Sequence, residues 1–226
     1  MLDFLKRRNA AATPARGFRE LLFGDVPLSA WAGTADDEPW ASFRKSAEDL
    51  TRKDAASARR ALSSVLAVPG LESRHYLQAW SVMRSLGVVP PAEEAKRVLG
   101  VVVDVPVDKG ADTLAAYEDR SARYLNHDGS SIVWDAGGTE AIIDARVGAF
   151  LDAGRTLVAM IGPWSGERPP LARGQARISI LTPSGLHFGQ GPLEALSRDP
   201  LAAPVFNTGT ALMVALTSHA AAARRS

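Results

Sequence analysis

The chain contains no cysteine, and this absence removes several kinds of chemistry at once. None of its 226 residues can form a disulfide, a thiolate metal site or a cysteine nucleophile. A protein without disulfides fits a reducing compartment, although many periplasmic proteins also lack cysteine. We therefore expect a cytoplasmic location.

Long apolar runs are also missing. No segment approaches the roughly 20 consecutive apolar residues of a membrane-spanning helix, so we expect no membrane span. Residues 1–14 place their apolar side chains before their basic ones and lack a continuous apolar stretch, which is a poor match to a secretory signal. We predict a soluble protein in which residues 1–17 form a flexible or docked N-terminal segment.

The chain has no excess of charge of either sign. Its 26 basic and 25 acidic side chains give a net charge of +1, which creates no long-range field to gather a polyanion. We therefore expect no nucleic-acid partner.

Motifs for cofactors and metals are absent as well. Gly189-Gln190-Gly191 lacks the third glycine and the strand–loop–helix setting of a dinucleotide site. No ligand spacing pairs the histidines, which are His75, His127, His187 and His219. The sequence predicts neither a cofactor nor a metal site.

Three amphipathic segments stand in the N-terminal half. They span residues 39–53, 54–67 and 72–86. In each, apolar side chains recur every third or fourth position, which indicates a helix with one buried face. Asp54 is placed to cap the second helix and Gly87 to end the third. Residues 18–90 are therefore predicted to form a helical subdomain that ends at Pro90-Pro91.

A region rich in β-branched residues comes next. Residues 98–107 are followed by short apolar runs over 114–118, 122–125 and 131–134, with polar or glycine-bearing joints between them. His127-Asp128-Gly129 is a hairpin turn of the usual composition. This pattern is typical of an antiparallel meander.

The remaining residues predict both helices and strands. The expected elements are a helix over residues 139–152 that ends at Gly154, a strand over 156–161, an irregular loop over 162–174, a hairpin of 176–182 and 186–188, a short helix over 192–197, and a C-terminal helix from Thr208 or Thr210. Strands joined by short turns favour an α+β fold. We predict an antiparallel sheet of about five to seven strands, packed with helices, in residues 91–226.

The first candidate site follows the second hairpin. His187 exchanges protons near neutral pH, and Gly189 and Gly191 let a ligand approach the backbone before a helix that starts at Pro192. His187 is accordingly the candidate catalytic residue of a hydrolase or transferase. The alternative is a strand end and a tight turn, with His187 bonded to the backbone. A serine hydrolase is disfavoured, because Ser184 lacks the Gly-x-Ser-x-Gly elbow and we expect poor geometry for a Ser184–His187 hydrogen bond.

Aromatic side chains give a second candidate site. Those on or beside the predicted sheet are Tyr117, Tyr124, Trp134, Trp164 and Phe188, with Arg123 and Arg177 between them. Such a face binds a peptide or planar ligand, unless its aromatic residues belong to the core. Trp164 lies in a stiff loop, where core packing explains it less well. The predicted ligand-binding residues are Trp164, His187, Gly189, Gln190, Gly191, Tyr117 and Arg123.

Residues 116–124 and 181–192 resemble a group of uncharacterised bacterial proteins. The resemblance covers roughly residues 98–215 and implies a bacterial origin, but it transfers no activity to any residue. From the residues themselves we predict a module that binds a small ligand or a protein without catalysis. The alternatives are the enzyme that uses His187 and a homodimeric assembly component.

Overall fold

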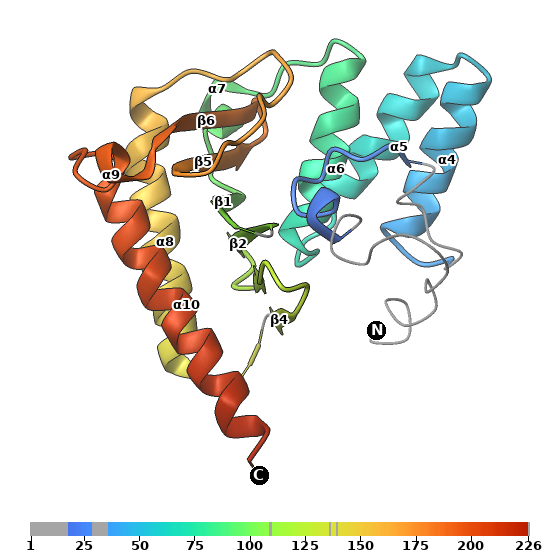
Figure 1. Cartoon of the computed structure of the whole chain (residues 1–226). Helices are drawn as coiled ribbons and strands as arrows, with labels where there is room; N and C mark the ends of the chain where they lie inside the picture. Colours follow the sequence, from blue (N-terminus) through green and yellow to red (C-terminus); the bar gives the residue numbers. More distant parts are fainter. Residues whose placement is uncertain (1–17, 29–35, 109, 136, 139, 226) are drawn as a thin grey trace.

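The protein has three layers, which Figure 1 shows side by side: N-terminal helices, a central β-sheet and a pair of long helices. The structure, a computed structural model, describes residues 18–28, 36–108, 110–135, 137–138 and 140–225. The sheet has six strands, and every pair of neighbouring strands is antiparallel. The predicted α+β fold with a preceding helical region is confirmed. The predicted N-terminal segment, residues 1–17, lies outside the described residues.

The N-terminal layer contains the three predicted helices. They are α4 (Trp40–Thr51), α5 (Ala55–Ala67) and α6 (Ser73–Ser85). The Asp54 carboxylate accepts a hydrogen bond of 2.9 Å from the Ser57 N–H, so the predicted cap of the second helix is present. Gly87 follows α6 with φ of 77°, the left-handed backbone that ends many helices.

A meander and a hairpin form the sheet. The strands are β1 (Gly100–Val107), β2 (Gly110–Tyr117), β3 (Ala122–Leu125), β4 (Ser131–Trp134), β5 (Gln175–Thr182) and β6 (Gly185–Pro192). Their order is β4-β3-β2-β1-β5-β6. The turn predicted at residues 127–129 joins β3 to β4, and the turn of the second predicted hairpin joins β5 to β6. The second strand begins at Gly110 rather than at residue 114, because its polar start pairs with β1 and the Thr113 hydroxyl donates to Asp104 at 2.6 Å.

The helix α8 (Ala141–Met160) corrects two predictions. The strand expected over residues 156–161 is wrong, because Leu157 and Val158 extend the buried helical stripe by another turn. Gly154 does not end the helix. A Cβ atom at Gly154 would lie 2.5 Å from Cγ2 of Val101, so the glycine allows α8 to pack closely on β1.

The other long helix, α10 (Ala203–Ala223), begins earlier than Thr208 or Thr210. The Asp199 carboxylate accepts hydrogen bonds of 2.9 Å from the N–H groups of Leu201 and Ala202. This negative charge stabilises the start of the helix. The shorter helices are α7 (Ala92–Ala95) and α9 (Leu193–Leu196), and α9 lies within the short helix predicted over residues 192–197.

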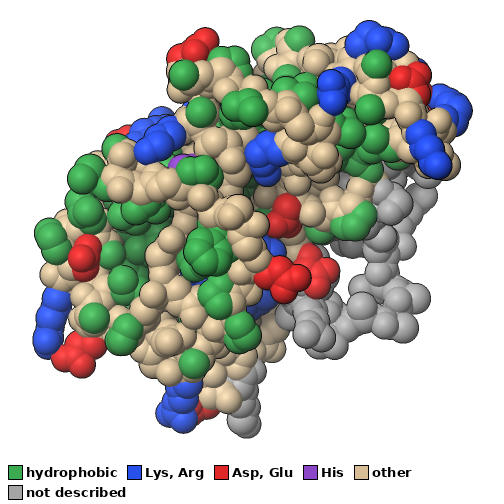
Figure 2. Space-filling view, turned by 90° about the horizontal axis from the view of Figure 1, so that it is seen from above, with side chains coloured by type: hydrophobic (Ala, Val, Ile, Leu, Met, Phe, Trp, Pro, Cys, Tyr) green, Lys and Arg blue, Asp and Glu red, His purple; other side chains and the backbone are tan. Residues whose placement is uncertain are grey.

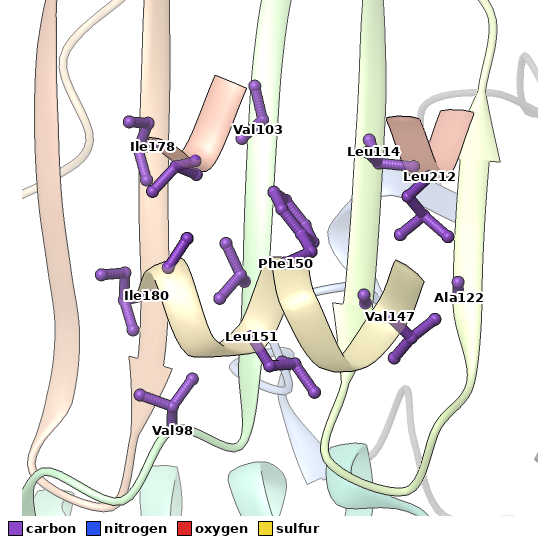
Figure 3. Packing of buried hydrophobic residues seen from close by; sticks show 14 of the residues in the cluster. Val98, Val103, Leu114, Ala122, Val147, Phe150, Leu151, Ile178, Ile180 and Leu212 are labelled. Atoms are coloured by element: carbon purple, nitrogen blue, oxygen red, sulfur yellow. The ribbon is translucent and has the colours of Figure 1, made fainter. Parts of the chain in front are cut away.

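The sheet separates two hydrophobic cores. The first joins the sheet to α8 and α10, and Figure 3 shows Phe150 and Leu151 of α8 directed at the strands. The second joins the opposite face to α4, α5, α6 and residues 18–28. Because successive strand residues point to opposite faces, β1 supplies Val101 and Val103 to the first core and Val102 to the second.

Polar contacts also join α6 to the turn between β2 and β3. The Asp119 carboxylate accepts a hydrogen bond of 2.6 Å from the Ser73 N–H. In return, the Ser73 hydroxyl accepts a hydrogen bond of 3.0 Å from the Asp119 N–H. The carboxylate thus lies at the positive end of α6. The predicted division into residues 18–90 and 91–226 stays a prediction, and these two parts share the second core.

The face of the molecule that Figure 2 draws carries mixed charge. Figure 2 shows Lys and Arg side chains interspersed with Asp and Glu on one face, without a large area of either sign. Within the part of the chain that the structure describes, no helix has both the length and the apolar character needed to cross a membrane.

Candidate functional site

A surface pocket of about 870 Å³ lies where four segments meet near the end of α6. It is lined by Asp25, by Arg84 and Ser85 of α6, by residues 163–168 of the loop after α8, and by Ser184, Gly185 and Leu186 at the β5–β6 turn. The end of α6 and the loop after α8 lie together at the top of Figure 1. The pocket includes two residues considered from the sequence, Trp164 and Ser184.

Trp164 is held in place and yet remains accessible. Its backbone N–H donates a hydrogen bond of 2.7 Å to the Leu186 carbonyl, so the loop covers part of the outer edge of β6. Its indole Nε1 donates a hydrogen bond of 3.2 Å to the Glu167 carbonyl. Its ring packs edge to face against Phe188, with the two ring centroids 5.0 Å apart. The residue is nevertheless 49% exposed. A fixed aromatic side chain with an open face suits ligand contact, because little freedom is lost when it binds.

Ser184 and His187 are hydrogen-bonded, which corrects the expectation of poor geometry. The Ser184 Oγ lies 3.1 Å from the His187 Nε2. The prediction was wrong because the connection from Thr182 to Gly185 is tight and turns both side chains toward each other. A Ser–His contact is the arrangement in which an imidazole accepts the serine proton.

The other nitrogen of His187 fixes its tautomer. Its Nδ1 lies 3.2 Å from the Ile161 carbonyl, which only accepts hydrogen bonds, so Nδ1 carries the proton. The Lys96 ammonium donates to the same carbonyl at 3.1 Å. Burial lowers the pKa of His187; the bond to Ile161 opposes this shift and the charge of Lys96 adds to it. Neutral His187 therefore presents an acceptor, Nε2, to the Ser184 hydroxyl.

Two arginines bring positive charge to the pocket. Arg84 donates 2.8 Å from Nη1 to the Pro183 carbonyl, which places its guanidinium beside the hairpin. Burial lowers the pKa of Arg84, and the charge of Asp25 opposes the shift. The ordinary pKa of arginine is so high that the group stays protonated at neutral pH despite this shift. Arg168 lies in the same loop as Trp164, with Nη2 3.5 Å from the Asp25 carboxylate.

Three predicted residues lie on β6, outside the pocket. Gly189, Gln190 and Gly191 do not form a turn before a helix; they pair with β5 as a regular strand. The Gln190 side chain accepts from Arg177 and donates 3.0 Å to the Pro170 carbonyl. The helix that follows, α9, has four residues, so it does not support the anion site expected at its start.

Two further predicted residues are buried away from the pocket. Tyr117 has no exposed surface, and its hydroxyl donates 2.7 Å to the Leu22 carbonyl within the second core. Arg123 is 4% exposed. It donates a hydrogen bond of 2.6 Å to the Trp134 carbonyl and another of 2.9 Å to the Asp135 carboxylate. Their predicted role in ligand binding stays a prediction, and the contacts explain both as structural.

Arg84, Arg168 and Asp25 were not found from the sequence. Arg168 shares the stiff loop of Trp164, which is a usable signal, whereas Arg84 and Asp25 have no local pattern. Among the described residues, no three His, Asp or Glu side chains stand close enough together to hold a metal ion.

Comparison with models of known protein families finds no matching family, and comparisons with curated proteins and with solved structures find no match. The resemblance to a group of bacterial proteins therefore stays a prediction.

Proposed function

We propose that the protein is a binding module that takes a small molecule in the pocket between the end of α6 and the β5–β6 turn. The supporting observation is the combination of an 870 Å³ pocket with Trp164, a fixed and half-exposed aromatic side chain, on its wall. Ligand pockets commonly have volumes of roughly 300–1,000 Å³ and combine apolar walls with a few polar groups. Here Trp164 and Leu186 supply apolar wall. The polar groups are the guanidiniums of Arg84 and Arg168, two carboxylates and three serine hydroxyls, from Asp25, Glu167, Ser85, Ser165 and Ser184.

Native mass spectrometry of the purified full chain tests this proposal. We expect a small-molecule mass that is retained under gentle conditions and lost on denaturation. Trp164→Ala should reduce its occupancy by about tenfold, through loss of aromatic contact area. Val89→Ala is the control, because Val89 is 83% exposed and does not line the pocket.

Either of two results would count against a small-molecule site. A bare wild-type chain would favour a protein partner and make a pull-down the next step. Equal occupancy in wild type and in Trp164→Ala would move the ligand away from this pocket. Thermal melting of both variants checks that each remains folded.

A hydrolase or transferase is the second candidate, favoured by the Ser184–His187 hydrogen bond. Ser184 Oγ would attack the carbon or phosphorus atom of an ester while its proton passes to His187 Nε2. The bond to the alkoxide leaving group would then break, and the imidazolium would give that proton to the departing oxygen. One feature weakens this candidate: the Ser184 N–H donates to the Ala95 carbonyl at 3.0 Å, so it is not available to an oxyanion. A fluorophosphonate probe that labels the wild type but not Ser184→Ala would support the enzyme, and no labelling would count against it.

Two further expectations belong with this proposal. A cytoplasmic location is supported by the lack of cysteine, and fractionation of the source cells tests it.

The homodimer alternative gains support from α10, which has no acidic or basic side chain apart from His219. A monomer at high micromolar concentration, in analytical ultracentrifugation, would exclude it.

A further inference from the structure

Arg168 lines the pocket and has one hydrogen-bond donor without a partner among the described residues. Its guanidinium lies over the Phe23 ring, with Cζ 3.8 Å from the ring centroid. Its Nη1 is buried and, among the residues that the structure describes, has no hydrogen-bond partner. A buried donor that bonds to nothing costs free energy, so the Arg168 guanidinium keeps an unmet capacity for an acceptor.

Arg84 brings a second guanidinium to the same place. Its bond to the Pro183 carbonyl occupies only part of the donor capacity of the group. That bond also orients the group, because it ties the end of α6 to the tip of the hairpin. Two planar guanidinium groups from different segments thus line one pocket, an arrangement suited to carboxylate or phosphate oxygens.

A small recess adjoins the pocket and shares several of its lining residues. It measures about 40 Å³ and is lined by both arginines, by the polar residues Asp25 and Thr182, by Gly185, and by the apolar residues Phe23, Leu77, Leu181 and Leu186. One water needs roughly 10–15 Å³ on this scale. The recess therefore has room for the few oxygen atoms of one anionic group.

Asp25 neutralises this charge only in part. Its carboxylate is 3.5 Å from Arg168 Nη2 and its side chain is 45% exposed. A strong charge-assisted hydrogen bond is shorter, roughly 2.7–2.9 Å. A ligand anion would therefore compete with a weakly held, solvated carboxylate.

We infer that Arg84 and Arg168 form an oxyanion subsite, which binds the carboxylate or phosphate group of an organic ligand whose apolar part lies against Trp164. The inference rests on the proposed function and adds the chemical class of the ligand. It assigns two separate tasks: the arginines recognise the anion, and the indole supplies contact area.

Isothermal titration calorimetry with three matched probes tests the subsite on the full chain. The probes are phenyl phosphate, benzoate and benzyl alcohol, which share an aromatic ring and differ in charge. We expect one or both anions to bind at least about tenfold more tightly than the alcohol and to weaken as NaCl is raised. The stronger of the two anions identifies the headgroup.

Three variants locate the site. Arg168→Met should weaken anion binding by about tenfold or more, whereas Arg173→Met should leave it unchanged. Arg173 is a matched control, because it lies in the same loop, is 79% exposed and pairs with Asp108 outside this pocket. Asp25→Asn should tighten anion binding severalfold, since it removes the competing charge, and a misfolded variant cannot imitate such a gain.

The possible failures are distinct. Equal binding of benzyl alcohol and the anions, lost in Trp164→Ala, would overturn the subsite and leave the small-molecule pocket standing. Anion binding that Arg173→Met weakens as much as Arg168→Met would also overturn the subsite. Absence of binding by all three probes would overturn both the subsite and the proposed function.

Discussion

Two glycines in α8 give a matched test of how closely this helix packs on the sheet. A Cβ atom at Gly154 would stand 2.5 Å from Cγ2 of Val101, which is held in the core. A Cβ atom at Gly148 would meet Nη1 of Arg120 at 2.6 Å, but that atom ends a flexible side chain and can move aside. We therefore expect Gly154→Ala and Gly148→Ala to change stability in opposite directions.

The magnitudes follow from two competing effects. Alanine is favoured over glycine inside a helix by about 1 kcal/mol, and both variants gain this. Overpacking a core costs roughly 1–3 kcal/mol, so Gly154→Ala should lower the free energy of unfolding by about 1 kcal/mol. Gly148→Ala loses at most the exposed 3.2 Å bond from Arg120 to the Asp144 carbonyl. That bond is worth roughly 0.5 kcal/mol, so a small net gain is expected.

Urea and thermal denaturation, followed by circular dichroism, measure the difference. For a chain of this size 1 kcal/mol shifts the melting temperature by about 2–4 °C. The two variants should therefore differ by roughly 3–6 °C. Equal melting temperatures, or a more stable Gly154→Ala, would refute the close approach of α8 to β1.

Three more perturbations probe single contacts. Lys96→Met should lower the free energy of unfolding by about 1–2 kcal/mol in urea melts, because Lys96 donates to the Val158, Ala159 and Ile161 carbonyls at the end of α8; an unchanged value would contradict the cap. Tyr117→Phe should cost about 1–2 kcal/mol by the same assay, since it leaves the buried Leu22 carbonyl without its 2.7 Å donor. Burial lowers the pKa of His75 from 6.5 to about 4, so protons bind the unfolded chain preferentially as pH falls below 6.5. Wild-type stability should fall by up to about 3 kcal/mol between pH 6.5 and pH 4, and His75→Phe should remove that part of the slope; an equal slope in both proteins would refute the assignment.

The N-terminal helices were predictable because each carries its own signals. Asp54 caps α5, Gly87 ends α6, and the apolar stripes between them identify the buried faces. The end of α8 was not predictable in this way. Gly154 is a stop signal by itself, and only the presence of Val101 opposite it explains a glycine inside the helix.

The site was predictable only in part. Trp164 was predicted as a ligand contact because core packing explains a large aromatic residue in a stiff loop less well. The structure places it on the pocket wall, and its role in binding stays a prediction. A bond from His187 to the backbone was the alternative considered from the sequence, and it is present. Its partner Ile161 was not predictable, because it reaches His187 only when α8 is folded to its full length. Arg84 and Asp25 come from segments distant in the chain, and no local pattern joins them.

The first residues of β1 carry a further consequence for the alignment of the sheet. Valines follow Gly100 at three successive positions and face both cores, so a slip of one residue would exchange one valine for another at nearly equal hydrophobic gain. The glycine breaks this degeneracy. Gly100 pairs with Tyr117, and a Cβ atom there would lie 2.8 Å from the tyrosine ring. The correct alignment is thus specified by one residue that lacks a side chain and one large ring that occupies the space, while the valines around them are interchangeable.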